Sequence, residues 1–192
     1  MGKLTLIIGG ARSGKSTHAQ RLAEQHGGQV VFLATATAGD DEMSARIKKH
    51  QQERPTGWVT REIPHGVAAA VAAAPVQAEV VLLDCLTLLV SNVTLLGMDD
   101  FDHPDELAAA NRVEEEISGL ISTIKKSPAD WIIVTNEVGL GLVPPFPVGR
   151  IYRDLLGRAN QRIAAQADEV YWLVAGIPVP IHGFRENCLQ SP

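Results

Sequence analysis

The chain has 192 residues, of which 45% are hydrophobic, and this suits one domain with a sizeable core. Its formal net charge of −5 argues against a nucleic-acid-binding protein, and its apolar stretches are too short and interrupted to span a membrane. The two cysteines form no metal or redox motif, and Cys85 is expected to be a small, buried hydrophobic residue. With no signal-peptide pattern ahead of the first predicted strand, we expect a cytoplasmic protein.

A strand, a glycine-rich loop and a helix are predicted in succession at the start of the chain. Leu4–Ile8 is apolar and β-branched, as in a buried parallel strand, and helical spacing follows to about His26. The loop between them fits the phosphate-binding motif G-x-x-x-x-G-K-[ST]. Its residues are Gly9, Gly10, Ala11, Arg12, Ser13, Gly14, Lys15 and Ser16. In such a loop backbone N–H groups surround phosphate, Lys15 reaches the β- and γ-phosphates, and the Ser16 hydroxyl can ligate Mg²⁺.

Strands and helices alternate through the rest of the chain. Further strands are predicted at residues 29–34, 58–63, 79–84, 130–135 and 169–174, with an edge hairpin at 176–181. Further helices are predicted at about residues 40–54, 67–74, 86–96, 104–126 and 150–167. This alternation predicts an α/β, P-loop NTPase-like three-layer fold, with helices on both faces of a mostly parallel sheet. We expect a single domain over residues 1–182 and a C-terminal tail over 183–192.

Polar residues at several predicted strand ends could form one site, because ligands of such sheets bind beyond the carboxyl ends of the strands. These positions are the loop at Gly9, the Thr35 region, Asp84 and Asn136-Glu137. Asp84 closes an apolar strand and could hold Mg²⁺ near Ser16, or it could cap the following helix. The Gly/Pro-rich connection over residues 136–149 is long enough to indicate a functional loop.

His50 lies among basic residues, in the predicted helix that ends near Arg54. The pattern alone leaves two interpretations open, a solvated basic helix face or a site for phosphate oxygens. Arg54 could likewise contact phosphate, or its charge could offset the dipole at the end of the helix.

Blocks of residues, in this order along the chain, resemble those of one enzyme family. They are Gly9–Ser16, the segment from Asp40 to Pro55, Thr135–Gly139 and the segment from Tyr152 to Arg162. From Leu4 to about Ile181 the chain is similar to the bifunctional adenosylcobinamide kinase / adenosylcobinamide-phosphate guanylyltransferase family of cobalamin assembly. The resemblance implies that ATP or GTP phosphorylates the aminopropanol hydroxyl of adenosylcobinamide. It also implies that GMP from GTP passes through a histidine to adenosylcobinamide phosphate, giving adenosylcobinamide-GDP.

The resemblance also implies the residues of the site. His50 would be the guanylylated residue, and it would join Lys15 in catalysis. Besides the loop, the nucleotide site would comprise Ala34, Thr35, Ala36, Gln51, Gln52, Glu53, Arg54, Glu62 and Asp84. Ser16 and Asp84 would hold Mg²⁺.

For some residues, a structural role remains possible besides the role that the resemblance implies. Glu62 could simply be a solvent-facing carboxylate. Glu137, Arg153 and Asp154 could shape the corrinoid side or form a structural ion-pair network. Members of the family form oligomers, commonly trimers, so a homo-oligomer is expected.

Two other functions stay open at this stage. One is a P-loop small-molecule kinase without nucleotidyl transfer, in which His50 would be dispensable. The other is a nucleotide-switch protein with a protein partner, in which the 136–149 loop would order with nucleotide and no acceptor substrate would exist.

Overall fold

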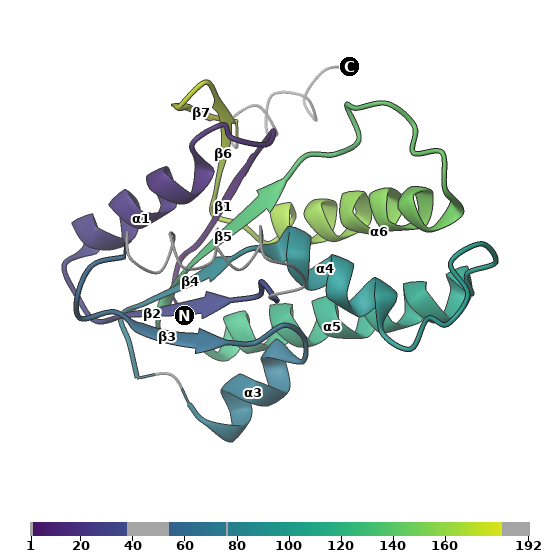
Figure 1. Ribbon diagram of the computed structural model, residues 1–192. Helices are drawn as coiled ribbons and strands as arrows, with labels where there is room; N and C mark the ends of the chain where they lie inside the picture. Colours follow the sequence, from purple (N-terminus) through teal and green to yellow (C-terminus); the bar gives the residue numbers. More distant parts are fainter. Residues whose placement is uncertain (1, 38–53, 76, 182–192) are drawn as a thin grey trace, which may run out of the picture.

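Parallel strands form the centre of the molecule, as the alternation predicts. The computed structural model describes residues 2–37, 54–75 and 77–181, which contain one seven-stranded sheet of order β3-β2-β4-β5-β1-β6-β7 (Figure 1). The strands are β1 (Leu4–Gly9), β2 (Val30–Ala34), β3 (Val59–Glu62), β4 (Val80–Asp84), β5 (Asp130–Asn136), β6 (Glu169–Val174) and β7 (Ile177–Pro180). Neighbouring strands from β3 to β6 pair in parallel, and β7 returns antiparallel along β6. The predicted α/β fold and the edge hairpin are therefore confirmed.

Helices pack on both faces of this sheet (Figure 1). They are α1 (Lys15–His26), α3 (Val67–Ala73), α4 (Leu86–Leu95), α5 (Glu106–Lys126) and α6 (Pro147–Ala164). Helix α1 buries Ala19 and Ala23 in the cluster that holds Ile7, whereas α3 to α6 join the cluster that holds Leu6 and Ile8. Successive residues of a strand point to opposite faces, so β1 contributes to both cores and is buried along its whole length.

The register of the strands brings their carboxyl ends to one edge of the sheet. Gly9 at the end of β1 pairs with Asn136 at the end of β5. Asp84 at the end of β4 pairs with Ala34 at the end of β2, which in turn pairs with Glu62 at the end of β3. The residues expected to meet at the carboxyl edge therefore do so.

Several predicted boundaries differ from the structure. Helix α6 begins at Pro147, so the connection after β5 is shorter than the predicted 136–149 loop. Proline fits the first turn of a helix because the N–H that it lacks would have no helical acceptor there. The helix predicted over about 40–54, the end of the predicted domain at residue 182 and the tail over 183–192 lie outside the described residues, apart from Arg54.

None of the helices in the described part of the chain is long and apolar enough to cross a membrane.

Candidate functional site

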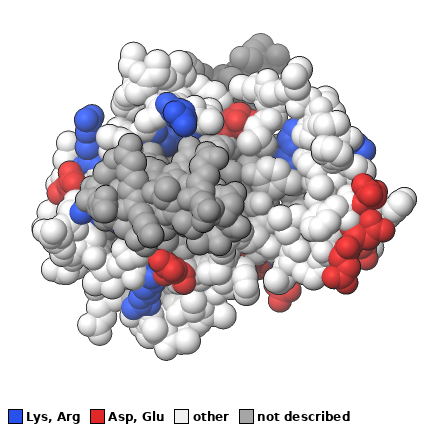
Figure 2. Space-filling view, in the orientation of Figure 1, with Lys and Arg blue, Asp and Glu red and all other residues white. Residues whose placement is uncertain are grey.

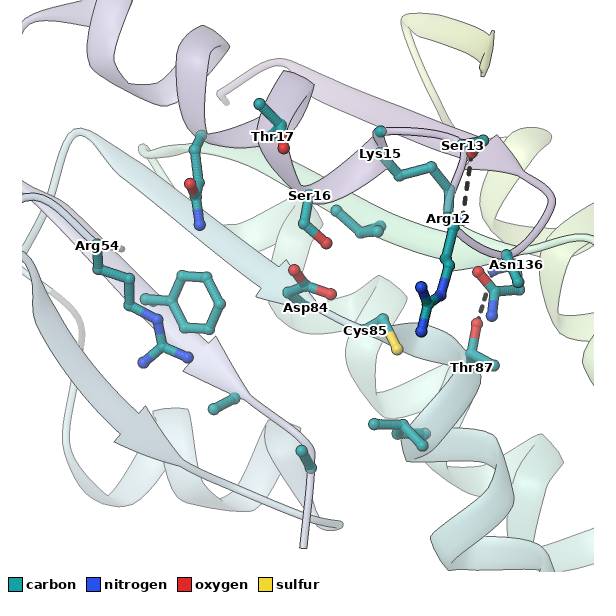
Figure 3. Close-up of a pocket in the computed structure, with 18 of the residues that line it drawn as sticks. Arg12, Ser13, Lys15, Ser16, Thr17, Arg54, Asp84, Cys85, Thr87 and Asn136 are labelled. Atoms are coloured by element: carbon teal, nitrogen blue, oxygen red, sulfur yellow. Dashed lines mark hydrogen bonds between the residues drawn. The ribbon is translucent and has the colours of Figure 1, made fainter. Parts of the chain in front are cut away.

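A pocket of about 490 Å³ opens at the carboxyl edge of the sheet (Figure 3). Its walls come from the loop after β1, the start of α1, the ends of β2 to β5 and the start of α4. The predicted site residues that line it are Ala11, Arg12, Ser13, Gly14, Lys15, Ser16, Ala34, Ala36, Arg54, Glu62 and Asp84. His50, Gln51, Gln52 and Glu53 fall outside the described residues.

The loop after β1 depends on glycine at positions where a side chain would clash. A Cβ at Gly9 would lie 2.5 Å from the carbonyl oxygen of Leu173, on the neighbouring strand β6. Gly14, the N-cap of α1, has a φ of 92°, in the left-handed region that favours glycine. Neither Gly9 nor Gly10 lines the pocket, and Gly9 acts by letting the chain pass closely beside β6.

Lys15 is folded back onto its own loop. Its Nζ donates to the carbonyl oxygen of Gly10 at 2.5 Å and contacts the Ser13 Oγ at 3.4 Å. Lys15 is only 7% exposed, and burial lowers the pKa of its ammonium group, while the negative charge of Asp84 opposes this shift. A phosphate in the pocket would offer this cation a stronger partner than a backbone carbonyl.

Ser16 and Asp84 are two residues of the pocket that could hold a magnesium ion. The Ser16 hydroxyl and the Asp84 carboxylate both line it and point toward one another (Figure 3). The N-cap position of α4 belongs to Cys85, so Asp84 is not the capping residue. Within the described ranges no three His, Cys, Asp or Glu side chains gather as a metal site. Mg²⁺ needs no such cage, because it commonly takes one or two protein oxygens together with phosphate and water.

Arg54 borders the opposite side of the pocket, beside an aromatic side chain. The centre of its guanidinium lies 3.7 Å from the centroid of the Phe32 ring, and its Nη1 donates to Thr60 Oγ1 at 3.1 Å. Its Nε is buried and has no hydrogen-bond partner among the described residues. Burial lowers the pKa of Arg54, while Asp84 and Glu62 oppose the shift, and the group stays charged. Glu62 itself lines the pocket and is exposed, so both interpretations of this carboxylate agree with its position.

Thr35 lies behind the wall of the pocket. It is fully buried, and its Oγ1 donates to the carbonyl oxygen of Cys85 at 2.7 Å and accepts from the Cys85 N–H at 2.9 Å. Its own carbonyl oxygen accepts from Asn92 at 2.8 Å. The hydrogen bonds of Thr35 therefore connect the end of β2 to the start of α4, and its side chain does not face the pocket.

Sequence reasoning missed several residues of the wall. They are Thr17, Gln20, Phe32, Cys85, Thr87, Leu88 and Val134. Cys85, expected to be a small, buried hydrophobic residue, packs against the core but is partly exposed, and its side chain faces the pocket (Figure 3). The signal for Phe32 was the period of a strand, because side chains at positions 32, 34 and 36 share one face.

Cys85 is expected to react slowly with alkylating reagents despite lining an open pocket. Burial raises the pKa of its thiol to about 12, and the adjacent carboxylate of Asp84 acts in the same direction. The reactive thiolate is therefore scarce at neutral pH, and we expect alkylation by iodoacetamide to be at least about a hundredfold slower than for free cysteine, even allowing for the greater nucleophilicity of a high-pKa thiolate.

The rate of Cys85 alkylation should be followed by peptide mass spectrometry. It should rise without levelling off between about pH 7 and pH 10, because the titration midpoint lies above this range. Protein unfolded in guanidinium is the control, and its Cys85 should react as an ordinary thiol. A rate in the folded protein that levels off near pH 9 would contradict the assignment.

Buried polar side chains hold the far wall of the pocket in place. Thr135 Oγ1 donates to Asn160 Oδ1 at 2.7 Å, and Asn160 Nδ2 donates to the carbonyl oxygen of Asn136 at 3.0 Å. The N–H of Asn136 donates to Thr87 Oγ1 at 2.7 Å (Figure 3). Because Thr135, Asn160 and Thr87 are buried, this network fixes β5, α4 and α6 relative to one another at the pocket.

One cluster of negative charge in the described part of the chain lies away from the pocket. Exposed carboxylates cluster in the connection between α4 and α5 and at the start of α5, seen in red at the right of Figure 2. The pocket meets the first residues of α4, whereas this connection follows its last residue, roughly 15 Å farther along the helix. That separation exceeds the screening length at physiological salt, so the acidic cluster repels a polyphosphate in the pocket only weakly.

A glycine-rich loop between a parallel strand and a helix, with a lysine, a serine and a strand-end aspartate in one pocket, defines a nucleotide-binding enzyme of the P-loop class. Residues 5–181 match the family described as cobinamide kinase / cobinamide phosphate guanyltransferase, and the chain belongs to this family. The family assignment made from the sequence is confirmed, and with it the prediction of a kinase and guanylyltransferase.

The curated relatives are similar over almost their whole length. The bifunctional adenosylcobalamin biosynthesis protein CobU of Salmonella typhimurium strain LT2 is 42% identical over 93% of this chain and 99% of that protein. CobU of Escherichia coli K12 is 43% identical over the same shares. The bifunctional adenosylcobalamin biosynthesis protein CobP of Pseudomonas aeruginosa is 40% identical over 93% of this chain and 96% of that protein. Among solved structures, the RadB recombinase overlays with a TM-score of 0.46 at 14% identity, over 89% of this chain and 74% of that one.

Proposed function

We propose that this pocket binds ATP or GTP and serves two transfers, first to adenosylcobinamide and then to adenosylcobinamide phosphate. The proposal rests on one observation above others, the convergence of Lys15, Ser16 and Asp84 in one pocket of a chain that matches the family over residues 5–181. The curated relatives are named bifunctional, which supports two activities in one chain.

In the first reaction the acceptor hydroxyl oxygen attacks the γ-phosphorus of the triphosphate. The bond from that phosphorus to the leaving nucleoside diphosphate breaks, and the hydroxyl proton is released to solvent. Lys15 would leave the carbonyl oxygen of Gly10 and follow the charge that develops on the γ-phosphate, while backbone N–H groups of the loop hold the remaining phosphates. Ser16 and Asp84 would hold Mg²⁺, which supplies charge neutralisation when bound.

In the second reaction a ring nitrogen of His50 is the nucleophile. It attacks the α-phosphorus of GTP, pyrophosphate leaves, and the proton on the other ring nitrogen is released to solvent. An oxygen of the acceptor's phosphate then attacks the same phosphorus and the P–N bond breaks. The imidazole takes a proton back, and the product is adenosylcobinamide-GDP. Arg54, with its charge and an Nε that has no hydrogen-bond partner among the described residues, would bind phosphate oxygens of the nucleotide. Gln51, Gln52 and Glu53, which lie outside the described residues, would belong to the same nucleotide site.

We also propose a homo-oligomer, a trimer by family resemblance, that acts in the cytoplasm, where its nucleotide substrates are found. The support is the number of exposed apolar side chains on the connection after β5, where Leu140, Leu142, Val143 and Phe146 are 81%, 96%, 65% and 66% exposed. Large apolar side chains exposed together in one segment are typical of an interaction site.

The test of this function is product formation from defined substrates. Purified protein is incubated with adenosylcobinamide, ATP and Mg²⁺, GTP is then added, and both stages are analysed by mass spectrometry. We expect adenosylcobinamide phosphate first and adenosylcobinamide-GDP second. Phosphate transfer without GMP transfer would instead indicate a monofunctional kinase, and no transfer to either acceptor would indicate a nucleotide switch.

Asp84→Asn is expected to raise the Mg²⁺ concentration required for activity by about tenfold or more, because it removes the charge of a ligand and keeps its shape. The measurement is a Mg²⁺ titration of the kinase reaction at saturating nucleotide. Asp99→Asn, in the exposed α4–α5 connection, is the matched control and should titrate like the wild type. If Asp84→Asn and the wild type gave superimposable titrations, Asp84 would not be a ligand of the magnesium ion.

A further inference from the structure

The pocket extends to both sides of the phosphate loop. Toward β2 and β3 it is lined by Ala34, Arg54 and Glu62, which the family resemblance assigns to the nucleotide. Toward α4 and β5 it is lined by Thr87 and Asn136, to which the resemblance assigns nothing (Figure 3). Lys15, Ser16 and Asp84 lie between these two sides. In phosphoryl transfer the attacking and leaving oxygens stand in line on opposite sides of the phosphorus. With the nucleotide toward Arg54, the acceptor must approach from the side of Asn136.

Arg12 places a cation on this acceptor side. Its side chain extends from the loop toward Cys85, Thr87 and Asn136 (Figure 3). No carboxylate in residues 2–37, 54–75 or 77–181 forms an ion pair with it. Arg12 has a φ of 56°, a left-handed conformation that costs roughly 1 kcal/mol for a residue with a side chain and that is often found where ligands are held. An exposed guanidinium without a carboxylate partner is suited to two parallel hydrogen bonds with a phosphate.

Asn136 and Thr87 form the wall that faces this cation. The backbone of Asn136 is fixed on both sides, since its N–H donates to Thr87 Oγ1 at 2.7 Å and its carbonyl oxygen accepts from Asn160 at 3.0 Å. The side-chain amide of Asn136 makes no hydrogen bond to another described residue, so both its donor and its acceptor can serve a ligand. Leu88 and Cys85 add apolar surface beside it, which suits the carbon atoms of a short aliphatic arm.

We infer that the part of the pocket between Arg12, Thr87 and Asn136 binds the reactive end of the acceptor's arm, and that the Arg12 guanidinium pairs with the phosphate monoester that this arm carries in the second reaction. The inference rests on the proposed function. Arg12 would thus have two roles. Its backbone is part of the loop that binds the nucleotide, and its side chain binds the acceptor. Asn136 would hydrogen-bond the arm in both reactions, whereas Arg12 matters most once the arm is charged.

The test compares Arg12→Ala with Asn136→Asp and with Arg21→Ala, an exposed arginine on α1 outside the pocket. Three constants are measured for each protein: the KM for adenosylcobinamide phosphate, the KM for adenosylcobinamide, and the GTP concentration that half-saturates covalent guanylylation without acceptor. For Arg12→Ala we expect the KM for the phosphorylated acceptor to rise at least tenfold more than the other two constants. Arg12→Lys should restore part of the affinity for the phosphorylated acceptor, since lysine restores the positive charge but cannot form the bidentate hydrogen bonds of a guanidinium.

Asn136→Asp should also raise the KM for the phosphorylated acceptor more than the KM for the alcohol, because the new carboxylate would repel the phosphate. Arg21→Ala should leave all three constants as in the wild type. Equal increases for acceptor and GTP in Arg12→Ala would assign its side chain to the nucleotide and overturn the inference, as would no increase at all. A wild-type protein that transfers no GMP to acceptor would contradict the proposed function itself, which is a separate outcome.

Discussion

Lys15→Ala is expected to lower both the kinase and the guanylylation rates by about a thousandfold or more. The ammonium group is the one buried cation of the phosphate loop in the described structure, and it would follow the charge that develops during transfer. Steady-state kinetics with each substrate measures both losses. Lys125→Ala, at the exposed end of α5, is the control and should keep wild-type rates. Turnover of Lys15→Ala within a few-fold of wild type would contradict the assignment of the loop.

The same substitution should not lower the thermal stability of the nucleotide-free protein. Burial lowers the pKa of Lys15, which means that the folded state disfavours the charged form relative to the unfolded chain. Wherever Lys15 is protonated in the folded state, its charge therefore destabilises the fold relative to the unfolded chain, and this cost is relieved as pH rises through the depressed pKa. A thermal melt of Lys15→Ala with a Tm equal to or above wild type would show that the loss of activity is not a loss of folding.

His50→Ala is expected to abolish covalent guanylylation and GMP transfer while it retains phosphorylation of adenosylcobinamide. In the proposed mechanism both reactions use the phosphate loop, but only the second requires a nitrogen nucleophile. The wild-type adduct should be labile in acid and stable in base, as a phosphoramidate is, and its formation should slow at acid pH because the imidazolium has no free lone pair. Electrospray mass spectrometry of the intact protein with GTP and Mg²⁺ measures the adduct.

His65→Ala is a matched control for His50→Ala, because His65 is exposed and lies outside the pocket. It should form the adduct at the wild-type rate. Loss of both activities in His50→Ala, with the fold intact, would mean that His50 also serves the first reaction. Wild-type uptake of acid-labile GMP by His50→Ala would move the chemistry to another residue.

The residues at the carboxyl ends of the strands could be predicted from the sequence to lie at one site. The motif from Gly9 to Ser16 and the apolar strand before Asp84 each predict a local structure, and parallel pairing then brings them to the same edge without further information. That is why the fold and the position of the pocket followed from the pattern of residues.

The direction of individual side chains was harder to predict. Phe32, Ala34 and Ala36 line the pocket, while Thr35 between them is buried against Cys85. The same alternation puts Val134 and Asn136 on the wall and turns Thr135 inward to Asn160. The strand period gives the two faces but not which of them holds the ligand, and this depends on the loop that packs above.

Contacts between segments that are distant along the chain also could not be predicted from the sequence. Nothing in the residues around Arg54 shows that its guanidinium lies over Phe32, or that Asn160 near the end of α6 supports Asn136 at the end of β5. Likewise, the predicted connection over residues 136–149 includes Pro147 and Gly149, which lie in α6, because proline is favoured in the first turn of a helix. Such pairings depend on packing, which becomes visible only when the elements are in place.

The most direct test of the central claim is a chase of the guanylylated protein. The protein is labelled with GTP carrying ³²P at the α-position, freed of nucleotide by gel filtration, and mixed with unlabelled adenosylcobinamide phosphate for a single turnover. We expect the label to leave the protein and to appear stoichiometrically in adenosylcobinamide-GDP, at a rate no slower than steady-state turnover. Label that stays on the protein, or that is released only as GMP, would contradict a covalent guanylyl intermediate in this enzyme.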